Sequence, residues 1–233
     1  MEKEIEEVER ELVVPGETIV SGKEYLPGDG TKRIKEDIVA TKFGLSVIEE
    51  RTVKVIPVSG TYIPRRNNVV IGKIVDITYN GWLIDINSAY QAFLSLSEVK
   101  GFINKFELQG YLNFGDMLTA TIKSVKSRGV DLTMMVKGMH KLEEGMIIQI
   151  NPSKVPRVIG KKGSMISLIK EETNTMITLG QNGLIWIGSE NIENQLSAKK
   201  AIMKVAENSS TKGLTEKIKE FLEKEKNKGE SVR

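Results

Sequence analysis

Gly160-Lys161-Lys162-Gly163 is the stretch of the sequence best suited to binding a polyanion. Two glycines three positions apart let a ligand's backbone approach the main chain, because no Cβ intrudes. The helix expected to begin with Ser164 as its cap would offer its N-terminal amides to a phosphate group. Between Gly145 and Lys170 there are five basic residues and no Asp or Glu. The stretch therefore predicts a site for an RNA backbone, formed by Arg157, Gly160, Lys161, Lys162, Gly163 and Ser164.

A second group of cations lies earlier in the chain, within segments of alternating β character. Its members are Lys73, Lys123, Lys126 and Arg128. Lysine and arginine bind phosphate without reading the base, and such contacts depend strongly on salt. We expect these four residues to form a cationic surface that tolerates any RNA sequence.

The sequence does not contain the residues that most catalysts need. Cysteine is absent, which excludes cysteine zinc sites, iron–sulfur clusters and thiol catalysis, and His140 is the only histidine. Acidic pairs such as Glu49 and Glu50 are adjacent in sequence, so in regular structure they point apart rather than share a metal. We therefore expect no enzymatic activity, no metal and no cofactor.

The elements around the glycine loop follow a mixed α/β order. A strand at residues 146–150, a short helix at 152–159 and a second helix from Ser164 enclose the loop. Two strands at 175–179 and 184–187 and an amphipathic helix at 189–207 come next. This context, strand–helix–GxxG–helix–strand–strand–helix, makes the motif far more specific than a bare GxxG. A last helix carries Leu214, Ile218, Phe221 and Leu222 at helical spacing, and we expect it to pack on its own chain.

The middle of the chain is β-rich. Residues 69–78 form a long strand, and Asn80-Gly81 is a strong hairpin signal because both residues tolerate positive φ. Further strands are expected at 82–86, 92–94, 117–125 and 130–134. Five strands with a longer insertion after the third predict a small closed barrel of the OB type. Before it, Phe43, Leu45 and Val47, then Val53 and Val55, alternate as in a hairpin within a small β-rich module.

The region around residues 142–208 resembles a KH domain, and the barrel resembles an S1 RNA-binding domain. The S1 resemblance rests on Gly72-Lys73-Ile74-Val75, Asn80 to Ile86, Ser97-Glu98 and Gly115-Asp116. One barrel followed by one KH domain, behind a β-module with Pro-Gly-Glu and Gly-Asp-Gly-Thr, is similar to one family in particular. That family is the RNA-binding cap subunit of the archaeal exosome, the counterpart of the eukaryotic S1/KH subunits.

The resemblance implies a domain order and a set of partners. The expected fold is mostly β with an α/β part. Its modules are a ring-docking β-module at 1–64, an S1 barrel at 65–137, a KH domain at 138–210 and a helical tail at 211–233. The implied partners are single-stranded RNA, a hexameric ring of RNase-PH-like exosome subunits and other cap subunits. The cap would guide RNA into the ring for 3′→5′ phosphorolysis.

Membrane insertion and secretion are not expected, because no apolar run approaches the ~18–20 residues that cross a bilayer and the N-terminus is acidic. We expect a cytoplasmic protein. The alternatives are a free-standing S1/KH factor in transcription or translation and, more weakly, a fragment of polynucleotide phosphorylase. Many S1 domains carry aromatic residues and a histidine where this chain has Asn80, Leu83 and Ser95. Whether Tyr79, Trp82 and Phe93 point into the core or toward RNA is left open by the sequence.

Overall fold

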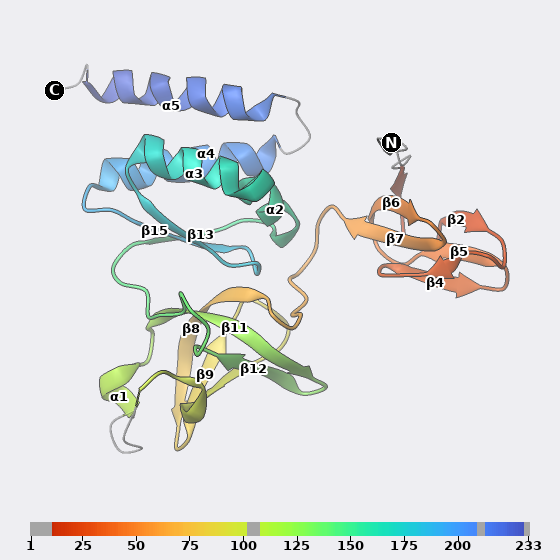
Figure 1. Cartoon of the computed structure of the whole chain (residues 1–233), viewed down its shortest axis with the longest axis horizontal. Coiled ribbons are helices and arrows are strands. Elements are labelled where there is room, and N and C mark those ends of the chain that lie inside the picture. The colour runs from red at the N-terminus through yellow and green to blue at the C-terminus, as the bar shows by residue number, and fades with distance from the viewer. Residues whose placement is uncertain (1–10, 102–107, 209–212, 231–233) are drawn as a thin grey trace, which may run out of the picture. The chain divides into compact units, whose positions relative to one another are not determined.

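The computed structural model describes residues 11–101, 108–208 and 213–230 of the chain. The acidic segment at residues 2–11 lies outside these residues, apart from Glu11. The chain divides into two compact units, with the boundary between Gly60 and Thr61. The second unit contains both a closed barrel and a sheet covered by helices (Figure 1).

The first unit is made of two small sheets. Their strand orders are β1-β6-β7-β3 and β2-β5-β4. The expected hairpin is confirmed as β6 and β7, but the unit has more strands than a hairpin, because most of the others span only two to four residues and show no clear alternation. The strands are β1 (Leu12–Val13), β2 (Thr18–Ser21), β3 (Leu26–Pro27), β4 (Thr31–Ile34), β5 (Asp37–Ala40), β6 (Gly44–Glu49) and β7 (Thr52–Pro57).

The five-stranded barrel predicted from the sequence is confirmed. Its strands are β8 (Val69–Thr78), β9 (Gly81–Asp85), β10 (Ala92–Ser95), β11 (Met117–Lys126) and β12 (Gly129–Thr133). They close in the order β10-β12-β11-β8-β9, with β10 and β12 parallel. Fully buried side chains such as Ile74, Ile84, Leu94 and Leu132 fill the interior, as the alternation requires. A short helix η1 (Leu96–Glu98) follows β10, and α1 (Leu108–Tyr111) precedes β11.

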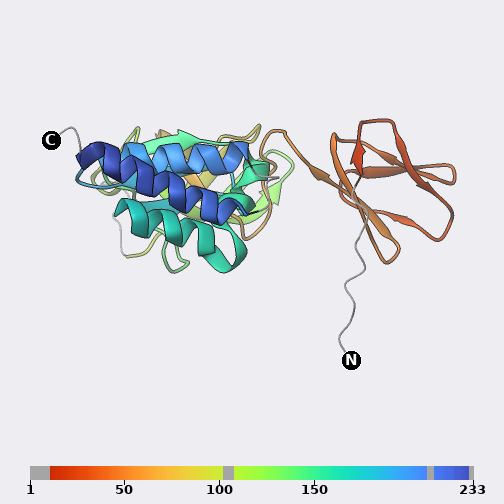
Figure 2. The ribbon, with the colours of Figure 1, turned by 90° about the horizontal axis from the view of Figure 1, so that it is seen from above.

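The part that resembles a KH domain is a three-stranded sheet covered on one face by helices. The sheet order is β13-β15-β14, and α3, α4 and α5 lie side by side over it (Figures 1 and 2). Its strands are β13 (Met146–Gln149), β14 (Met176–Leu179) and β15 (Leu184–Gly188). Its helices are η2 (Pro152–Lys154), α2 (Val155–Ile159), η3 (Lys161–Gly163), α3 (Ser164–Thr173), α4 (Ile192–Glu207) and α5 (Leu214–Glu230).

The C-terminal helix packs on its own chain, as expected. Leu214, Ile218 and Leu222 are buried in the same core as residues of α2, α3, α4 and the sheet. Lys204 of α4 lies 3.9 Å above the centre of the Phe221 ring, and Lys200 forms an ion pair with Glu225. The helix therefore completes the core of this domain.

Two helix starts differ from the expectation. Ser164 is not the cap: Gly163 holds that position, and Ser164 already has helical backbone angles. The left-handed backbone of Gly163 sets this start, so the serine hydroxyl is not needed for it. The helix α4 begins at Ile192 rather than Ser189, because the side chain of Asn191 accepts a hydrogen bond from the backbone N–H of Glu193 at 2.8 Å.

The barrel and the helix-covered sheet pack directly on each other. Alternate residues of β15 divide between two cores: Ile185 and Ile187 face the helices, whereas Trp186 contacts Ile71 of β8. At the β14–β15 turn, Asn182 is fully buried. Its amide donates hydrogen bonds to the carbonyl oxygens of Ile71 (2.7 Å) and Ile86 (2.9 Å), and its side-chain oxygen accepts from the backbone N–H of Ile71 (3.3 Å). One side chain thus ties the turn to β8 and to the residue that follows β9.

Candidate nucleic-acid interface

The glycine loop between α2 and α3 has a backbone that requires glycine at its first position. Gly160 has a φ of 75°, and a Cβ built there would lie 2.8 Å from both the Cβ and the backbone N of Met165. Gly163 has a φ of 83°, but a Cβ built there would meet no atom within 4 Å. The surface at Gly163 is therefore open, which is the condition for a close approach by a ligand backbone.

The two helices that carry the loop are held together by apolar side chains. Val158 of α2 and Met165, Ile166 and Ile169 of α3 are all buried in one core. Between the buried Val158 and Met165, six residues are exposed or half-buried, so the loop lies at the surface. The helices thus present the loop on a rigid support.

The charges of the loop are exposed. Within the described part of the chain, neither Lys161 nor Lys162 has an ion-pair partner, and both side chains lie in solvent. Arg157, in the last turn of α2, is also exposed. The N-terminus of α3 adds the positive end of a ten-residue helix dipole. Together these groups form a cationic site that suits phosphate.

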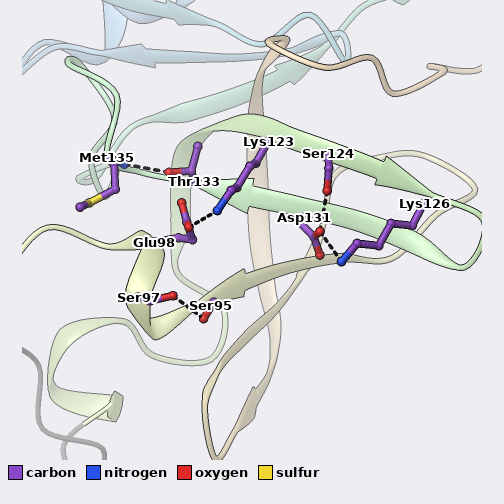
Figure 3. Close-up of polar contacts among 9 residues, drawn as sticks. All are labelled: Ser95, Ser97, Glu98, Lys123, Ser124, Lys126, Asp131, Thr133 and Met135. Carbon is purple, nitrogen blue, oxygen red and sulfur yellow. Dashed lines mark hydrogen bonds and ion pairs between the residues drawn. The ribbon is translucent and has the colours of Figure 1, made fainter.

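The cations of the barrel differ from the lysines of the glycine loop in their ion pairing. Lys123 and Lys126, both on β11, are paired with carboxylates of neighbouring elements (Figure 3). Lys123 pairs with Glu98 of η1, and the Nζ of Lys126 lies 2.5 Å from the carboxylate of Asp131 on β12. Lys73, on β8, stands opposite Asp85 of β9, and Arg128 is exposed in the β11–β12 turn. The four cations predicted from the sequence therefore do not form one unpaired cationic patch.

The two carboxylates that hold the lysines remain ionised at neutral pH. The hydrogen bond from Lys123 lowers the pKa of Glu98 below its usual value. Desolvation raises the pKa of Asp131, but hydrogen bonds from Lys126 and from Ser124, whose Oγ is 2.6 Å away, outweigh it and leave the pKa lowered. The sequence signal for these pairs was weak, because the partners come from separate elements.

The aromatic residues near the first hairpin have three different positions. Trp82 is fully buried, and its Nε1 donates a hydrogen bond to the carbonyl oxygen of Leu112 at 2.9 Å. Tyr79 is 85% exposed at the tip of the hairpin. Phe93 lies half-buried between the inward-facing Ala92 and Leu94, so its ring belongs to the outer face of the barrel. Of these three aromatic residues, only Trp82 lies in the core of the barrel.

Residues 11–101, 108–208 and 213–230 offer neither a metal site nor a membrane-spanning helix. No group of three or more His, Asp or Glu side chains there is placed to hold a metal ion. No helix among these residues is long and apolar enough to cross a membrane. His140 is exposed, and its Nδ1 lies 2.9 Å from the carbonyl oxygen of Gly138.

A closed five-stranded barrel packed on a helix–GxxG–helix domain defines a class of single-stranded nucleic-acid-binding proteins. Comparison with known proteins agrees. Residues 61–124 match the family model "RRP4, S1 domain", and residues 145–193 match the model of the KH domain.

The relatives narrow the class to a family. Exosome complex component Rrp4 of Methanothermus fervidus is 42% identical over 217 residues, covering 92% of this chain and 96% of the relative. The protein of the same name from Nitrosopumilus maritimus is 39% identical, covering 95% and 98%. A crystal structure of a protein provisionally named as an exosome complex RNA-binding protein is 34% identical, with a TM-score of 0.66, and covers 72% of this chain and 98% of that one. The chain belongs to the Rrp4 family of exosome complex components.

Proposed function

We propose that this protein is a non-catalytic cap subunit of an archaeal exosome that binds single-stranded RNA and guides it into a ring of RNase-PH-like subunits. The ring would carry out the 3′→5′ phosphorolysis, so the cap supplies affinity and direction rather than chemistry. The observation that carries the RNA-binding part is the glycine loop, with open space at Gly163 and lysines that no described carboxylate neutralises. Family membership supports the assembly with an exosome.

In this proposal, phosphates of the RNA lie against the loop. Lys161, Lys162 and Arg157 supply charge, while the positive end of α3, which begins at Ser164, adds to the attraction for phosphate. The backbone at Gly160 and Gly163 lets the RNA approach. The barrel cations Lys73, Lys123, Lys126 and Arg128 give a second, weaker contact that does not depend on base identity.

The first unit is the part that we propose docks on the ring. Leu12, Leu45 and Ile56 are direct cross-strand neighbours on β1, β6 and β7. Leu12 and Ile56 are each at least half exposed, so the row forms an apolar stripe on the surface of the sheet. Such a stripe suits a protein partner better than RNA. The stripe therefore supports a docking role for the first unit, which ends at Gly60 and precedes the barrel, the KH domain at 138–210 and the tail at 211–233. Other cap subunits on the same ring and a cytoplasmic location complete the proposal.

The test compares two substitutions at Gly163 in the full-length protein. Asn and Asp both tolerate the left-handed backbone and have the same shape, so Gly163→Asn controls for size and conformation. A carboxylate beside the phosphate would repel it, and we expect Gly163→Asp to bind a poly(A) oligonucleotide about five- to ten-fold more weakly than Gly163→Asn. Filter binding gives the affinities, and circular dichroism checks the fold.

Equal affinity of the two variants would place the main RNA site elsewhere on the chain. The double substitution of Gly160 and Gly163 is a poorer test, because a side chain at Gly160 would collide with Met165 and disturb the helix pair itself.

A further inference from the structure

The outer face of the barrel carries two lysine–carboxylate pairs that the RNA-binding role does not explain. Lys123 and Lys126 extend from β11 toward Glu98 and Asp131, which belong to η1 and β12 (Figure 3). The lysine side chains are more than half exposed, whereas Glu98 and Asp131 are 19% and 30% exposed. Each carboxylate is thus fixed in the surface, and each lysine folds back onto it.

The carboxylates are held in place by other contacts as well as by the lysines. Ser124 donates a hydrogen bond to Asp131 from the adjacent strand, at the residue directly opposite it in the ladder. The carboxylate of Glu98 also accepts a hydrogen bond from the side chain of Thr133, and its backbone carbonyl oxygen accepts one from the N–H of Met134. The acidic groups therefore stay where they are when a lysine moves away.

The two RNA-binding surfaces of the molecule consequently differ in electrostatic design. At the glycine loop, Lys161 and Lys162 have no carboxylate partner among the described residues, and Gly145 to Lys170 contains no acid at all. On the barrel, the positive charge of each β11 lysine is offset by a fixed negative charge within ion-pair distance. A phosphate that approaches Lys123 or Lys126 must compete with this carboxylate or accept its repulsion.

We propose that Glu98 and Asp131 attenuate the affinity of the barrel for RNA by occupying Lys123 and Lys126. The inference rests on the proposed RNA-binding function. In this arrangement the glycine loop holds the RNA firmly, while the barrel contacts the phosphates weakly and releases them quickly. Weak contact at one of two sites lets a strand slide past it, which suits a protein that passes RNA onward.

The test removes each negative charge without changing the shape of the side chain. Asp131→Asn and Glu98→Gln are made in the full-length protein, and a poly(A) oligonucleotide is the probe. Because an exposed ion pair is worth up to about 1 kcal/mol, each variant should bind about two- to five-fold more tightly than the wild type. The salt dependence of binding should also become steeper, because a freed lysine releases a further counterion.

Glu49→Gln is the matched control. Glu49 pairs with Lys54 at 2.7 Å in an exposed ion pair of the first unit, which carries none of the proposed RNA-binding residues, and the substitution changes the net charge by the same amount. Its affinity should equal that of the wild type. A second control adds Lys126→Ala to Asp131→Asn, which should abolish the gain because the freed lysine is gone.

Unchanged or weaker binding by both Asp131→Asn and Glu98→Gln would overturn the proposal, as would an equal gain in Glu49→Gln, since net charge alone would then explain the effect. Failure of the proposed RNA-binding function would give a different set of results. The wild-type protein would then not bind the oligonucleotide, or Gly163→Asp would bind like Gly163→Asn. If the two Gly163 variants behave as expected and the carboxylate variants do not, only the attenuation proposal is wrong, and the proposed RNA-binding function stands.

Discussion

Lys162 adopts a left-handed backbone conformation, with a φ of 52°, at the centre of the glycine loop. This conformation costs a residue with a side chain about 1 kcal/mol or more relative to glycine. Strain of this kind persists where the surrounding structure imposes it, and it concentrates at binding sites. The loop therefore keeps a strained lysine at a position where glycine would be easier to accommodate.

The substitution Lys162→Gly separates the two roles of this residue. We expect the free energy of unfolding to stay the same or to rise by up to about 1 kcal/mol, since the relieved strain offsets the added flexibility of the unfolded chain. RNA binding should weaken, and the slope of log affinity against log salt should fall by about one, since one phosphate contact is lost. Thermal denaturation and a salt series measure the two effects.

Lys35→Gly provides the control, because Lys35 has the same left-handed conformation, with a φ of 56°, in the first unit. It should show the same change in stability and no change in RNA binding. If Lys162→Gly binds RNA like the wild type, Lys162 does not contact phosphate.

At the scale of elements, the β14–β15 turn is the connection between the sheet and the barrel. Asn182 makes its hydrogen bonds there to Ile71 and Ile86, and all of them are buried. Replacing its amide nitrogen with a carboxylate oxygen would turn two attractive contacts with carbonyl oxygens into repulsive ones. We expect Asn182→Asp to lower the free energy of unfolding by about 3 kcal/mol or more at neutral pH.

The loss should depend on pH with a defined sign. Burial against carbonyl oxygens raises the pKa of the introduced carboxyl above its value in the unfolded chain, so the folded state binds the extra proton. The deficit is therefore small below about pH 4 and grows as the pH rises from there. Asn191→Asp is the control, since Asp caps a helix as well as Asn does. A deficit of equal size at pH 4 and pH 8 would show that charge is not its cause.

The sequence predicted the barrel and the helix pair well, because both rest on local patterns. Along β11, the apolar residues Leu118, Ala120 and Ile122 alternate with threonines and lie in the core. Gly160 and Gly163 identify the loop without any knowledge of tertiary contacts. The strands of the first unit were harder to predict from the sequence, because strands such as β1 and β3 have only two residues and depend on pairing with neighbouring strands.

The remaining gaps in the prediction involve residues far apart in sequence. Lys123 meets Glu98 across 25 residues, and Asn182 reaches Ile71 across 111. No periodicity in a single strand or helix reports such pairs, and lysines on a β-strand look the same whether paired or not. The candidate site residues could thus be named from their types, and they stay a prediction, whereas the difference in charge balance between the loop and the barrel required the three-dimensional structure.

For the whole molecule, the boundary between the two units determines where the chain should be cut to remove the first unit. Tyr62 belongs to the barrel: its ring is buried in the barrel core, its hydroxyl donates to the side chain of Asn68 at 2.9 Å, and burial raises its pKa to about 12. A cut at Pro64 would remove these contacts, so the truncated chain should start at Thr61.

We expect this truncated chain to stay folded and to bind RNA through Gly160 to Gly163. It should not co-elute with a reconstituted ring of RNase-PH-like subunits and should not stimulate phosphorolysis, because the apolar stripe is missing. The full-length variant Ile56→Asp, which disrupts the stripe alone, should show the same two defects. Normal assembly of the truncated chain would assign docking to the barrel or to α5. If the full-length protein itself never joins the ring, a free-standing RNA-binding factor becomes the better reading.

The packing of α5 has a consequence for how the protein is made. A chain leaves the ribosome from its N-terminus, and domains fold in that order as they emerge. The β-strands of the first unit and the barrel are complete once residue 133 is available. The RNA-binding loop appears early in the next domain, yet its core includes Leu214, Ile218 and Leu222. The nascent protein therefore carries an incomplete RNA-binding domain until Leu222 has emerged, and we expect weaker binding of RNA before that point.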